Sequence, residues 1–495
     1  MKMLWFLLLF LPVAGFGQAE MFSCKSVTVN SYEIYAPDVI QGICSDSITP
    51  DTTGMRDLTS VELSKEMIPG WNVGNSLEAI GGETEWGNPL ITQRLIDSVK
   101  AAGFKAIRIP VAWSKYTDAV NFTIDTVWMN RVEEVVNYVL SDSLYAIINI
   151  HWDGGWMQPT YARQDYVNNR LAVMWHQIAV HFRDYDDRLL FAGTNEVMVD
   201  GDYGTPSHEY TAVQNSFNQT FVSTVRSTGG RNYYRHLVVQ GFNTNINFTV
   251  SYFEIPDDAV ENRLMVEVHY YDPYNFTLNT ESGITQWGKY ATDPLRTETW
   301  ANESYADNQF LKMKTNFVNK GYGVILGEYG VISRTNLGSA ELNAEYAVYR
   351  RYYIEYITQS IVKNELVPVY WDNGYTGNHA FGLFYRSSGA QAHPEMIQAI
   401  IRGCDTNHII SRIGQINNES FRIYPNPVRN SMIIEVFDKS VLYGQLFSLN
   451  GQLIEKLSLE YGINTFDISE IEAGLYFIVV FTSKGTIVQK VKKNN

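Results

Sequence analysis

The chain has 495 residues, of which 45% are hydrophobic, so it can bury a large core and is longer than one domain of ordinary size. Its 53 acidic and 38 basic side chains give a formal net charge of −15, which argues against a nucleic-acid partner because phosphates bind lysine and arginine. The 32 tyrosines and 11 tryptophans indicate either a large aromatic core or rings that stack on sugars.

The N-terminus has the pattern of a secretory signal peptide, predicted over residues 1–19. Lys2 supplies the positive charge, Leu4–Val13 is apolar, and small residues follow it. No later run approaches the ~18 apolar residues that a membrane-spanning helix needs. Residues 20–57 are polar and turn-rich, and we interpret them as a leader segment without an assigned role.

The three cysteines are Cys24, Cys44 and Cys404. Export permits disulfides, and Cys24 and Cys44 could pair, but an odd count leaves one thiol over. None has a metal-binding spacing, and we favour the interpretation that they are structurally incidental.

Residues 58–404 alternate between short apolar, β-prone runs and longer stretches that fit helices, for example over 92–102, 129–141 and 170–182. Eight strand–helix units predict a (β/α)8 TIM barrel. A doubly wound open sheet is the alternative, but no glycine-rich phosphate loop follows the first strand. The candidate strands end near Asn72, Pro110, Ile150, Asn195, Gly241, His269, Glu328 and Trp371.

The sequence changes character after residue 404. Residues 405–420 are polar and read as a linker. Residues 421–495 contain short alternating runs separated by turn residues and predict a small all-β sandwich; the runs are FRIYPNP, SMIIEVF, VLYGQLFSLNG, INTFDIS, GLYFIVVF and TIVQKVKK. Physical reasoning alone leaves open whether it is a binding module, an adhesin-like domain or a sorting signal.

Two glutamates stand where β-prone runs end: Glu196 in FAGTNEVM and Glu328 in VILGEYGV. In a parallel barrel the carboxyl ends of the strands form the rim where active sites are built. A retaining glycosidase needs an acid/base carboxyl and a nucleophilic carboxylate about 5–5.5 Å apart. The fourth and seventh strands lie on facing parts of the rim, so we expect these two carboxylates to face each other.

Further residues with useful chemistry fall at the same rim. Arg108 lies in the strand AIRIP, where a buried arginine requires a partner, and it either holds a carboxylate ionised or forms an internal structural salt bridge. His151, His269 and Tyr271 follow or end strands. No histidine pair has a zinc spacing such as H-E-x-x-H, and no P-loop or dinucleotide fingerprint occurs, so neither a metal nor a cofactor is expected.

Trp371 ends the last predicted strand, where a tryptophan is either a platform for a sugar ring or a lid on the core; we favour the platform. Trp86, Trp152 and Trp156 lie on other rim loops and either line further sugar subsites or pack in their loops.

Eight blocks in order, GWNVGNSLEA, ETEWGNP, FKAIRIPVAW, INIHWDGGW, AGTNEVM, VHYYDPYNF, ILGEYG and YWDNG, resemble the signature blocks of glycoside hydrolase family 5, in particular its subfamily 4 endoglucanases. The resemblance spans about residues 58–400. It implies a (β/α)8 barrel and retaining endo-hydrolysis of β-1,4-linked glucans without a metal.

The same resemblance implies residue roles. Glu196 is similar in position to the family's acid/base and Glu328 to its nucleophile. Arg108 and Tyr271 would hold the nucleophile, and Asn195 would bind the 2-hydroxyl at the cleaved sugar. The remaining roles are substrate binding or shaping of the site, by His151, His269, Trp371, Asn72 and Trp152. Trp152 stands where many relatives carry a second histidine, a difference that concerns the upstream subsites rather than the chemistry.

The tail resembles the C-terminal sorting domain of the type IX secretion system, through YPNPV, LFSLNGQLI, FDIS and AGLYFIVVFTSKGTIVQKVKK. This implies passage through the outer membrane of a Gram-negative cell by that machinery. Release and surface attachment both remain open. The expected product is a secreted, monomeric enzyme.

The predicted mechanism is a double displacement on a β-glucan, in which Glu196 starts protonated and Glu328 ionised. The alternatives are a xyloglucan- or mannan-active hydrolase on the same barrel, a non-catalytic surface glycan-binding protein, and an adhesin that acts through the tail. Retention of both glutamates and of Arg108 argues against the glycan-binding protein.

Overall fold

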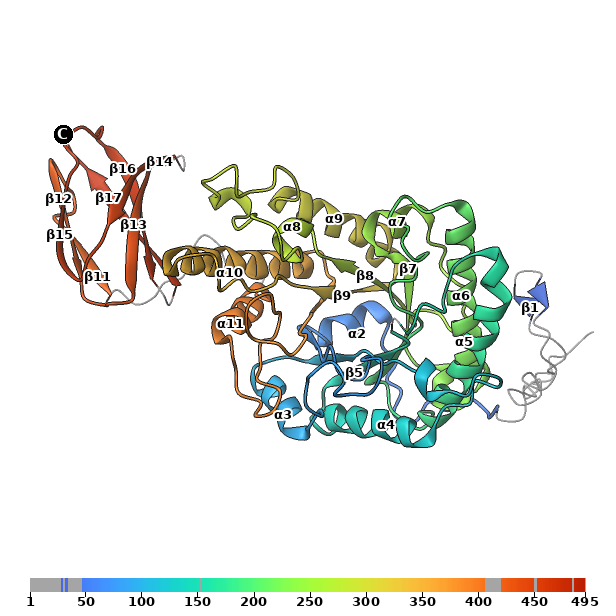
Figure 1. The fold of residues 1–495 in the computed structure, drawn as a ribbon. Helices are drawn as coiled ribbons and strands as arrows, with labels where there is room; N and C mark the ends of the chain where they lie inside the picture. The colour runs from blue at the N-terminus through green and yellow to red at the C-terminus, as the bar shows by residue number, and fades with distance from the viewer. Residues whose placement is uncertain are drawn as a thin grey trace, which may run out of the picture.

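Eight parallel strands form a closed barrel in the computed structural model of the protein, which describes residues 28–29, 32–33, 47–151, 153–405, 420–448, 452–482 and 485–494 (Figure 1). Neighbouring strands pair in the order β10-β3-β4-β5-β6-β7-β8-β9, so the last strand closes on the first. The predicted TIM barrel is confirmed. The strands are β3 (Gly70–Asn72), β4 (Ala106–Ile109), β5 (Tyr145–Asn149), β6 (Leu189–Ala192), β7 (Leu237–Asn245), β8 (Leu264–Tyr270), β9 (Gly323–Tyr329) and β10 (Val367–Tyr370).

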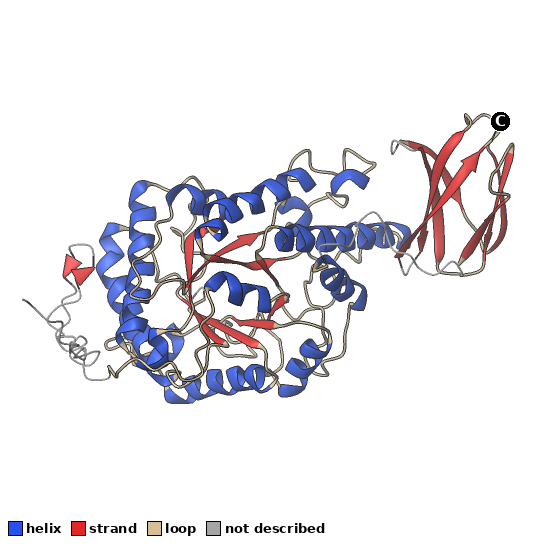
Figure 2. Ribbon diagram, turned by 180° about the vertical axis from the view of Figure 1, so that it is seen from behind, coloured by secondary structure: helices blue, strands red, loops and turns tan. Residues whose placement is uncertain are grey.

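Helices surround this barrel (Figure 2). The longer ones are α3 (Gln93–Ala101), α4 (Thr126–Ser141), α5 (Tyr161–His181), α6 (His208–Ser227), α9 (Glu303–Asn316), α10 (Ala340–Lys363) and α11 (Pro394–Gly403). The shorter ones are α2 (Ser60–Glu66), α7 (Ile246–Tyr252), α8 (Tyr274–Thr277), η1 (Ser114–Tyr116), η2 (Gly230–Tyr233), η3 (Gly288–Tyr290) and η4 (Val318–Lys320).

The helices predicted at 129–141 and 170–182 begin earlier than expected, as α4 and α5. Asp125 caps α4 because its side chain accepts a hydrogen bond from the backbone N–H of Val127, which satisfies a donor at the helix start. Helix α3 agrees with its prediction within a residue. It is amphipathic and buries Leu95, Ile96 and Val99 against the barrel.

Strand β6 ends at Ala192, before the predicted Asn195, and β7 continues past Gly241 to Asn245. The reason lies in side-chain hydrogen bonds. After Ala192, the carbonyl of Gly193 accepts from Trp175 Nε1 at 2.9 Å, and the backbone N–H of Thr194 donates to Gln240 Oε1 at 3.1 Å. The backbone N–H of Gly193 still donates to Val238 of β7, and from Thr194 on the side-chain bond to Gln240 takes the place of strand pairing.

The barrel interior is apolar at one end and polar at the other. Along β4 and β8, alternate side chains point inward, so Arg108 follows Ala106 and Glu267 follows Met265. Ala106 and Met265 belong to an apolar cluster that also contains Leu63 of α2 and Met67, the residue directly after α2. Arg108 and Glu267 are fully buried toward the rim. The alternation along these strands therefore places apolar side chains at one end of the barrel and polar side chains at the end where the site lies.

The C-terminal region forms two antiparallel sheets, β11-β12-β15 and β14-β13-β16-β17, as predicted for a small sandwich. The strands are β11 (Phe421–Tyr424), β12 (Ser431–Val436), β13 (Val441–Ser448), β14 (Leu453–Ser458), β15 (Gly462–Asp467), β16 (Gly474–Thr482) and β17 (Gly485–Lys493). Strand β14 was not predicted. It is an edge strand in which Leu457 is buried but Glu455 and Lys456 are exposed, so its apolar signal is weak.

The predicted signal peptide, most of the leader and of the linker, Cys24 and Cys44 lie outside the described residues, apart from the short pair β1 (Thr28–Val29) and β2 (Tyr32–Glu33). Cys404 is a free thiol, half-buried at the end of α11. Among the described helices, none combines the length and the apolar composition that crossing a bilayer requires.

Candidate active site

The predicted site residues within the described chain gather at the carboxyl ends of the barrel strands. Glu328 lies in β9 and Arg108 in β4, whereas Glu196 follows β6 in the turn of backbone that begins at Gly193. Glu196 has a φ of 44°, a left-handed conformation uncommon for a non-glycine residue. Such strain is frequent where a side chain must be aimed at a functional site. Trp152 lies outside the described residues.

Arg108 is the centre of the buried part of the site. Its side chain is 0% exposed, and Nη1 donates to Glu328 Oε1 at 2.9 Å and to Asn72 Oδ1 at 3.0 Å. Its Nη2 donates to Asn195 Oδ1, and Nε forms an ion pair with Glu267 Oε1 at 2.9 Å. A buried guanidinium is stable only when paired in this way.

Asn72, which was predicted to bind substrate or to shape the site, lies inside the barrel. Its side chain is 0% exposed. Oδ1 accepts from Arg108, and Nδ2 donates to the carbonyl of Gly327 at 2.8 Å. Both ends of the amide are therefore used inside the barrel, and Asn72 orients Arg108.

Glu328 accepts two hydrogen bonds, from Arg108 and from the Tyr271 hydroxyl at 3.1 Å to Oε2. Burial raises the pKa of Glu328 and outweighs the opposing charges of His269 and Arg108. Burial also raises the pKa of Tyr271 far above its usual value, so its hydroxyl stays a donor.

Glu196 has a different environment. Its side chain is 41% exposed, and Oε1 lies 2.7 Å from His269 Nδ1. Oxygens of Glu196 and Glu328 and a ring nitrogen of His269 all lie within 4.8 Å of one another. The two carboxylates are thus at the short separation that retaining glycosidases use, not the wider one of inverting enzymes.

His269 changes the expected proton distribution. Burial lowers its pKa, but the charge of Glu328 and hydrogen bonds to Glu196 and Glu267 raise the pKa of His269 to about 9. Desolvation raises the pKa of Glu196, but the hydrogen bond with His269 and the charges of His269 and Arg108 together outweigh it and leave this pKa below its usual value. The two carboxyl pKa values are separated as predicted but in the reverse order, because burial raises the pKa of Glu328 while His269 and Arg108 lower that of Glu196.

Asn195 presents an unused donor to the site. Its side chain is buried and oriented by the bond from Arg108 to Oδ1. No described residue accepts a hydrogen bond from its Nδ2. A buried donor without a partner is costly, so this amide is ready for a hydroxyl of a ligand.

His151 and Trp371 form the opposite wall. Their rings are stacked, with centroids 6.0 Å apart and planes at 9°. Burial holds the pKa of His151 well below its usual value, so this imidazole is neutral. Both side chains are half-buried, which leaves part of each ring for contact with a flat ligand.

A cavity of about 330 Å³ opens beside Glu196. Asn195 and Glu196 line it from one side and Trp156 from the loop after β5. Tyr203, which is 82% exposed, stands at its edge. Of the two alternatives left open for Trp156, lining a subsite and packing in its loop, each has some support, because the residue lines this cavity but is only 7% exposed.

Glu267 and Gln240 were missed by the sequence analysis. Glu267 contacts Arg108 and His269, and Gln240 Nε2 donates to Glu267 Oε2 at 2.8 Å. One signal was available. Glu267 is a charged residue inside the apolar strand MVEVH and lies two positions before His269, hence on the same face of β8.

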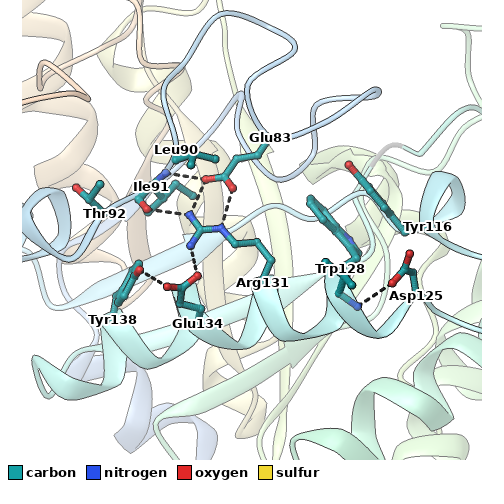
Figure 3. Close-up of a pocket in the computed structure, with 11 residues that line it drawn as sticks. Glu83, Leu90, Ile91, Thr92, Tyr116, Asp125, Trp128, Arg131, Glu134 and Tyr138 are labelled. Atoms are coloured by element: carbon teal, nitrogen blue, oxygen red, sulfur yellow. Dashed lines mark hydrogen bonds and ion pairs between the residues drawn. The ribbon is translucent and has the colours of Figure 1, made fainter.

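A second, larger cavity of about 540 Å³ lies away from these residues, against α4 (Figure 3). Arg131 stands between Glu83 and Glu134 there, with Nε 2.8 Å from Glu83 Oε2. The Tyr116 and Trp128 rings stack with centroids 3.8 Å apart. Both carboxylates are paired with one arginine, and none of the expected site residues lines this cavity.

The model of the family "Cellulase (glycosyl hydrolase family 5)" matches residues 72–377, and that of the secretion system C-terminal sorting domain matches residues 422–494. A xyloglucan-specific endo-β-1,4-glucanase of Bacteroides ovatus is 45% identical over 403 residues, which cover 77% of this chain and 79% of that protein. Endoglucanase A of Paenibacillus barcinonensis is 42% identical and covers 70% of this chain and 91% of its own.

Solved structures agree with these matches. The Bacteroides ovatus GH5 xyloglucanase in complex with a XXXG heptasaccharide has a TM-score of 0.70 at 46% identity, with 72% of this chain and 79% of that chain covered. A GH5-4 broad specificity endoglucanase from Bacteroides salanitronis has a TM-score of 0.65 at 38% identity, with 70% and 96% covered.

Proposed function

Because the chain belongs to the cellulase family, glycosyl hydrolase family 5, we propose that Glu328 and Glu196 carry out the cleavage, as nucleophile and acid/base. The protein is a retaining endo-β-1,4-glucanase. The observation that carries the assignment is the close approach of these two carboxylates, one paired with Arg108 and one beside a cavity.

In the first step an oxygen of Glu328 forms a bond with the anomeric carbon while the glycosidic bond breaks. The leaving oxygen takes its electron pair and a proton from Glu196. The hydrogen bonds from Arg108 and Tyr271 hold Glu328 in one orientation for this attack and favour its ionised form.

In the second step Glu196 takes a proton from water, whose oxygen bonds to the anomeric carbon and displaces Glu328. Two inversions give net retention. The free Nδ2 of Asn195 would donate to the 2-hydroxyl of the cleaved sugar, and Trp371 would stack on the sugar just upstream. His151 would support that wall.

The C-terminal sorting domain directs the enzyme to the outside of the cell or its surface. We propose that the type IX secretion machinery recognises this domain and that the barrel acts as a monomer without a cofactor. In this proposal residues 58–404 form the catalytic domain and residues 421–495 form the sorting domain.

The names of similar proteins from one organism favour a specific polymer as the substrate. The relative from Bacteroides ovatus and the solved Bacteroides ovatus structure are both named for xyloglucan, whereas other relatives are named endoglucanases or broad specificity enzymes. We therefore propose xyloglucan as a further candidate substrate beside unsubstituted β-1,4-glucan and mixed-linkage glucan.

The test uses the purified full chain on carboxymethylcellulose, mixed-linkage glucan, xyloglucan and glucomannan, with Glu328→Ala alongside. We expect rapid chain shortening by the wild type, products that NMR first detects as the β-anomer, and no turnover by Glu328→Ala. Near-normal activity of Glu328→Ala, or α-anomers as first products, would contradict the assignment.

A further inference from the structure

His269 lies between two glutamates. Its Nδ1 is 2.7 Å from Glu196 Oε1, and its Nε2 is 3.3 Å from Glu267 Oε1. Both ring nitrogens therefore face carboxylate oxygens, and a neutral imidazole can donate from only one of them. When His269 gives up one proton, the other ring nitrogen keeps its own. We expect the proton to stay on the nitrogen that faces the carboxylate with the more fixed position.

Glu267 is held firmly. Its side chain is fully buried, Arg108 Nε lies 2.9 Å from Oε1, and Gln240 Nε2 donates to Oε2 at 2.8 Å. Gln240 is itself fixed, because its Oε1 accepts from both the backbone and the hydroxyl of Thr194 at 3.1 Å. A Cβ on Gly327 would lie 1.9 Å from Glu267 Oε1, so the neighbouring strand leaves room for this carboxylate.

Glu196, by contrast, is partly exposed beside the cavity. The anchored carboxylate of Glu267 therefore favours a permanent proton on Nε2, and this leaves Nδ1 to exchange a proton with Glu196. The bond between Nδ1 and Glu196 then holds one proton, either as imidazolium with carboxylate or as imidazole with carboxylic acid. Both arrangements keep the same heavy-atom geometry.

We propose that Glu267 is a positioning residue that makes His269 and Glu196 a proton-holding pair for the leaving group. The inference rests on the proposed role of Glu196. Glu267 touches neither substrate nor reacting atoms; it acts through His269. Gln240 serves as a clamp, by which we mean that its hydrogen bond to Glu267 Oε2 holds that carboxylate in position.

The proton balance is complete. In the first step the proton of the pair passes from Nδ1 to Glu196 and on to the glycosidic oxygen, which receives the electron pair of the broken bond. His269 is then neutral with its proton on Nε2, and Glu196 is a carboxylate. In the second step water gives the pair its proton back as its oxygen bonds to the anomeric carbon.

The charged and titratable groups that face His269 come from six positions around the barrel: Glu196 after β6, Glu267 in β8, Glu328 in β9, Arg108 in β4, Tyr271 after β8 and His151 after β5. Removing the charge of Glu267 weakens proton binding by both members of the pair, because this carboxylate raises the pKa of His269 and opposes ionisation of Glu196. The alkaline limb of activity should therefore move to lower pH.

The test compares Glu267→Gln with the wild type on phenyl and 2,4-dinitrophenyl β-cellobiosides. The phenyl leaving group needs protonation and the dinitrophenyl group does not. We expect kcat/KM to fall about 10–100-fold for the phenyl substrate, part of the ~10²–10⁴-fold that general acid catalysis contributes, and about threefold or less for the other. The alkaline limb for the phenyl substrate should move down by about 1 pH unit.

Glu345→Gln is the matched control, because Glu345 also pairs with an arginine and a glutamine, Arg296 and Gln286, but belongs to α10. It should change neither substrate's kcat/KM. Gln240→Met removes the clamp and keeps the charge, so it tests the same pair if Glu267→Gln does not fold. It should show the same leaving-group dependence with a smaller loss.

Glu196→Ala is measured in the same series. If it shows the leaving-group dependence and Glu267→Gln loses activity equally on both substrates, or on neither, the proposal for Glu267 is overturned while the function stands. If Glu196→Ala itself shows no such dependence, the proposed role of Glu196 fails. These two failures are distinct.

Discussion

Two clusters in this barrel each join one arginine to two glutamates. In the inner cluster Arg108 pairs with Glu267 and Glu328, at 2.9 Å to each. In the outer cluster Arg131 pairs with Glu83 at 2.8 Å and with Glu134 at 2.5 Å (Figure 3). The inner arginine is fully buried, whereas Arg131 is 19% and Glu134 is 53% exposed.

The two clusters differ in the further contacts that surround their carboxylates. Glu83 also accepts the backbone N–H of Ile91 at 2.6 Å, so it fastens the loop between β3 and α3 to α4. The inner cluster stands next to a third carboxylate, Glu196, which has a histidine as its partner and faces a cavity. An arginine–glutamate pair alone thus indicates a structural role. A buried pair beside a carboxylate that can exchange a proton indicates a catalytic site.

The largest loss of activity is expected on replacement of Glu196, the third carboxylate, which lies beside the inner cluster. In Glu196→Ala, kcat/KM on β-glucan should fall by about 10²–10⁴-fold, because the leaving oxygen loses its general acid. Polymer hydrolysis followed by reducing ends measures this. Glu134→Ala in the outer cluster is the control, and an equal loss there would remove the distinction between the clusters.

A second test exchanges the arginines themselves. Arg108→Lys should lower kcat by about 100-fold, since an ammonium cannot reproduce the forked contacts to Glu328 and Glu267. Arg131→Lys should leave kcat within about twofold. Thermal unfolding of both variants shows whether they fold. Equal kcat in the two variants would mean that Arg108 has no more than a structural role.

The pH dependence of stability offers a third contrast, because both glutamates of the inner cluster lie close to His269. The folded-state pKa of His269 is raised from 6.5 to about 9. The stability that its protonation contributes is therefore complete below pH about 6.5 and is lost as the pH rises through about 9.

Accordingly, the Tm advantage of the wild type over His269→Asn should shrink across this pH window, as measured by calorimetry. The Tm difference between the wild type and Glu83→Gln should stay more nearly constant over the same range. A His269→Asn difference that grows with pH would contradict the proton assignment.

The smallest functional effect is expected for Glu83→Gln. Loss of its charge-assisted bonds to Arg131 should lower the free energy of unfolding by about 1.5–3 kcal/mol, because the Glu83 side chain is only 4% exposed. Urea unfolding measures this loss. The value of kcat should not change; a tenfold fall would show that the outer cluster takes part in shaping the cleft.

Much of the fold and part of the site could be predicted from sequence. The barrel followed from eight β-prone runs, most of which end within a residue of the observed strands. Glu196, Glu328 and Arg108 were found because a charged residue at or near the end of an apolar run is a local signal. The edge strand β14 was missed because its charged residues hide the alternation.

The sequence by itself determined which residues reach the rim of the barrel, since strand periodicity and turn signals act between near neighbours in the chain. Only the tertiary structure decided how their side chains are paired. Asn72 turns inward to Arg108, Glu267 contacts His269, and His269 lies beside Glu196 and lowers its pKa. These outcomes depend on charges and burial contributed by β3, β4, β7, β8 and β9 together, and a carboxylate's pKa is set by that shared, desolvated environment rather than by its neighbours in sequence.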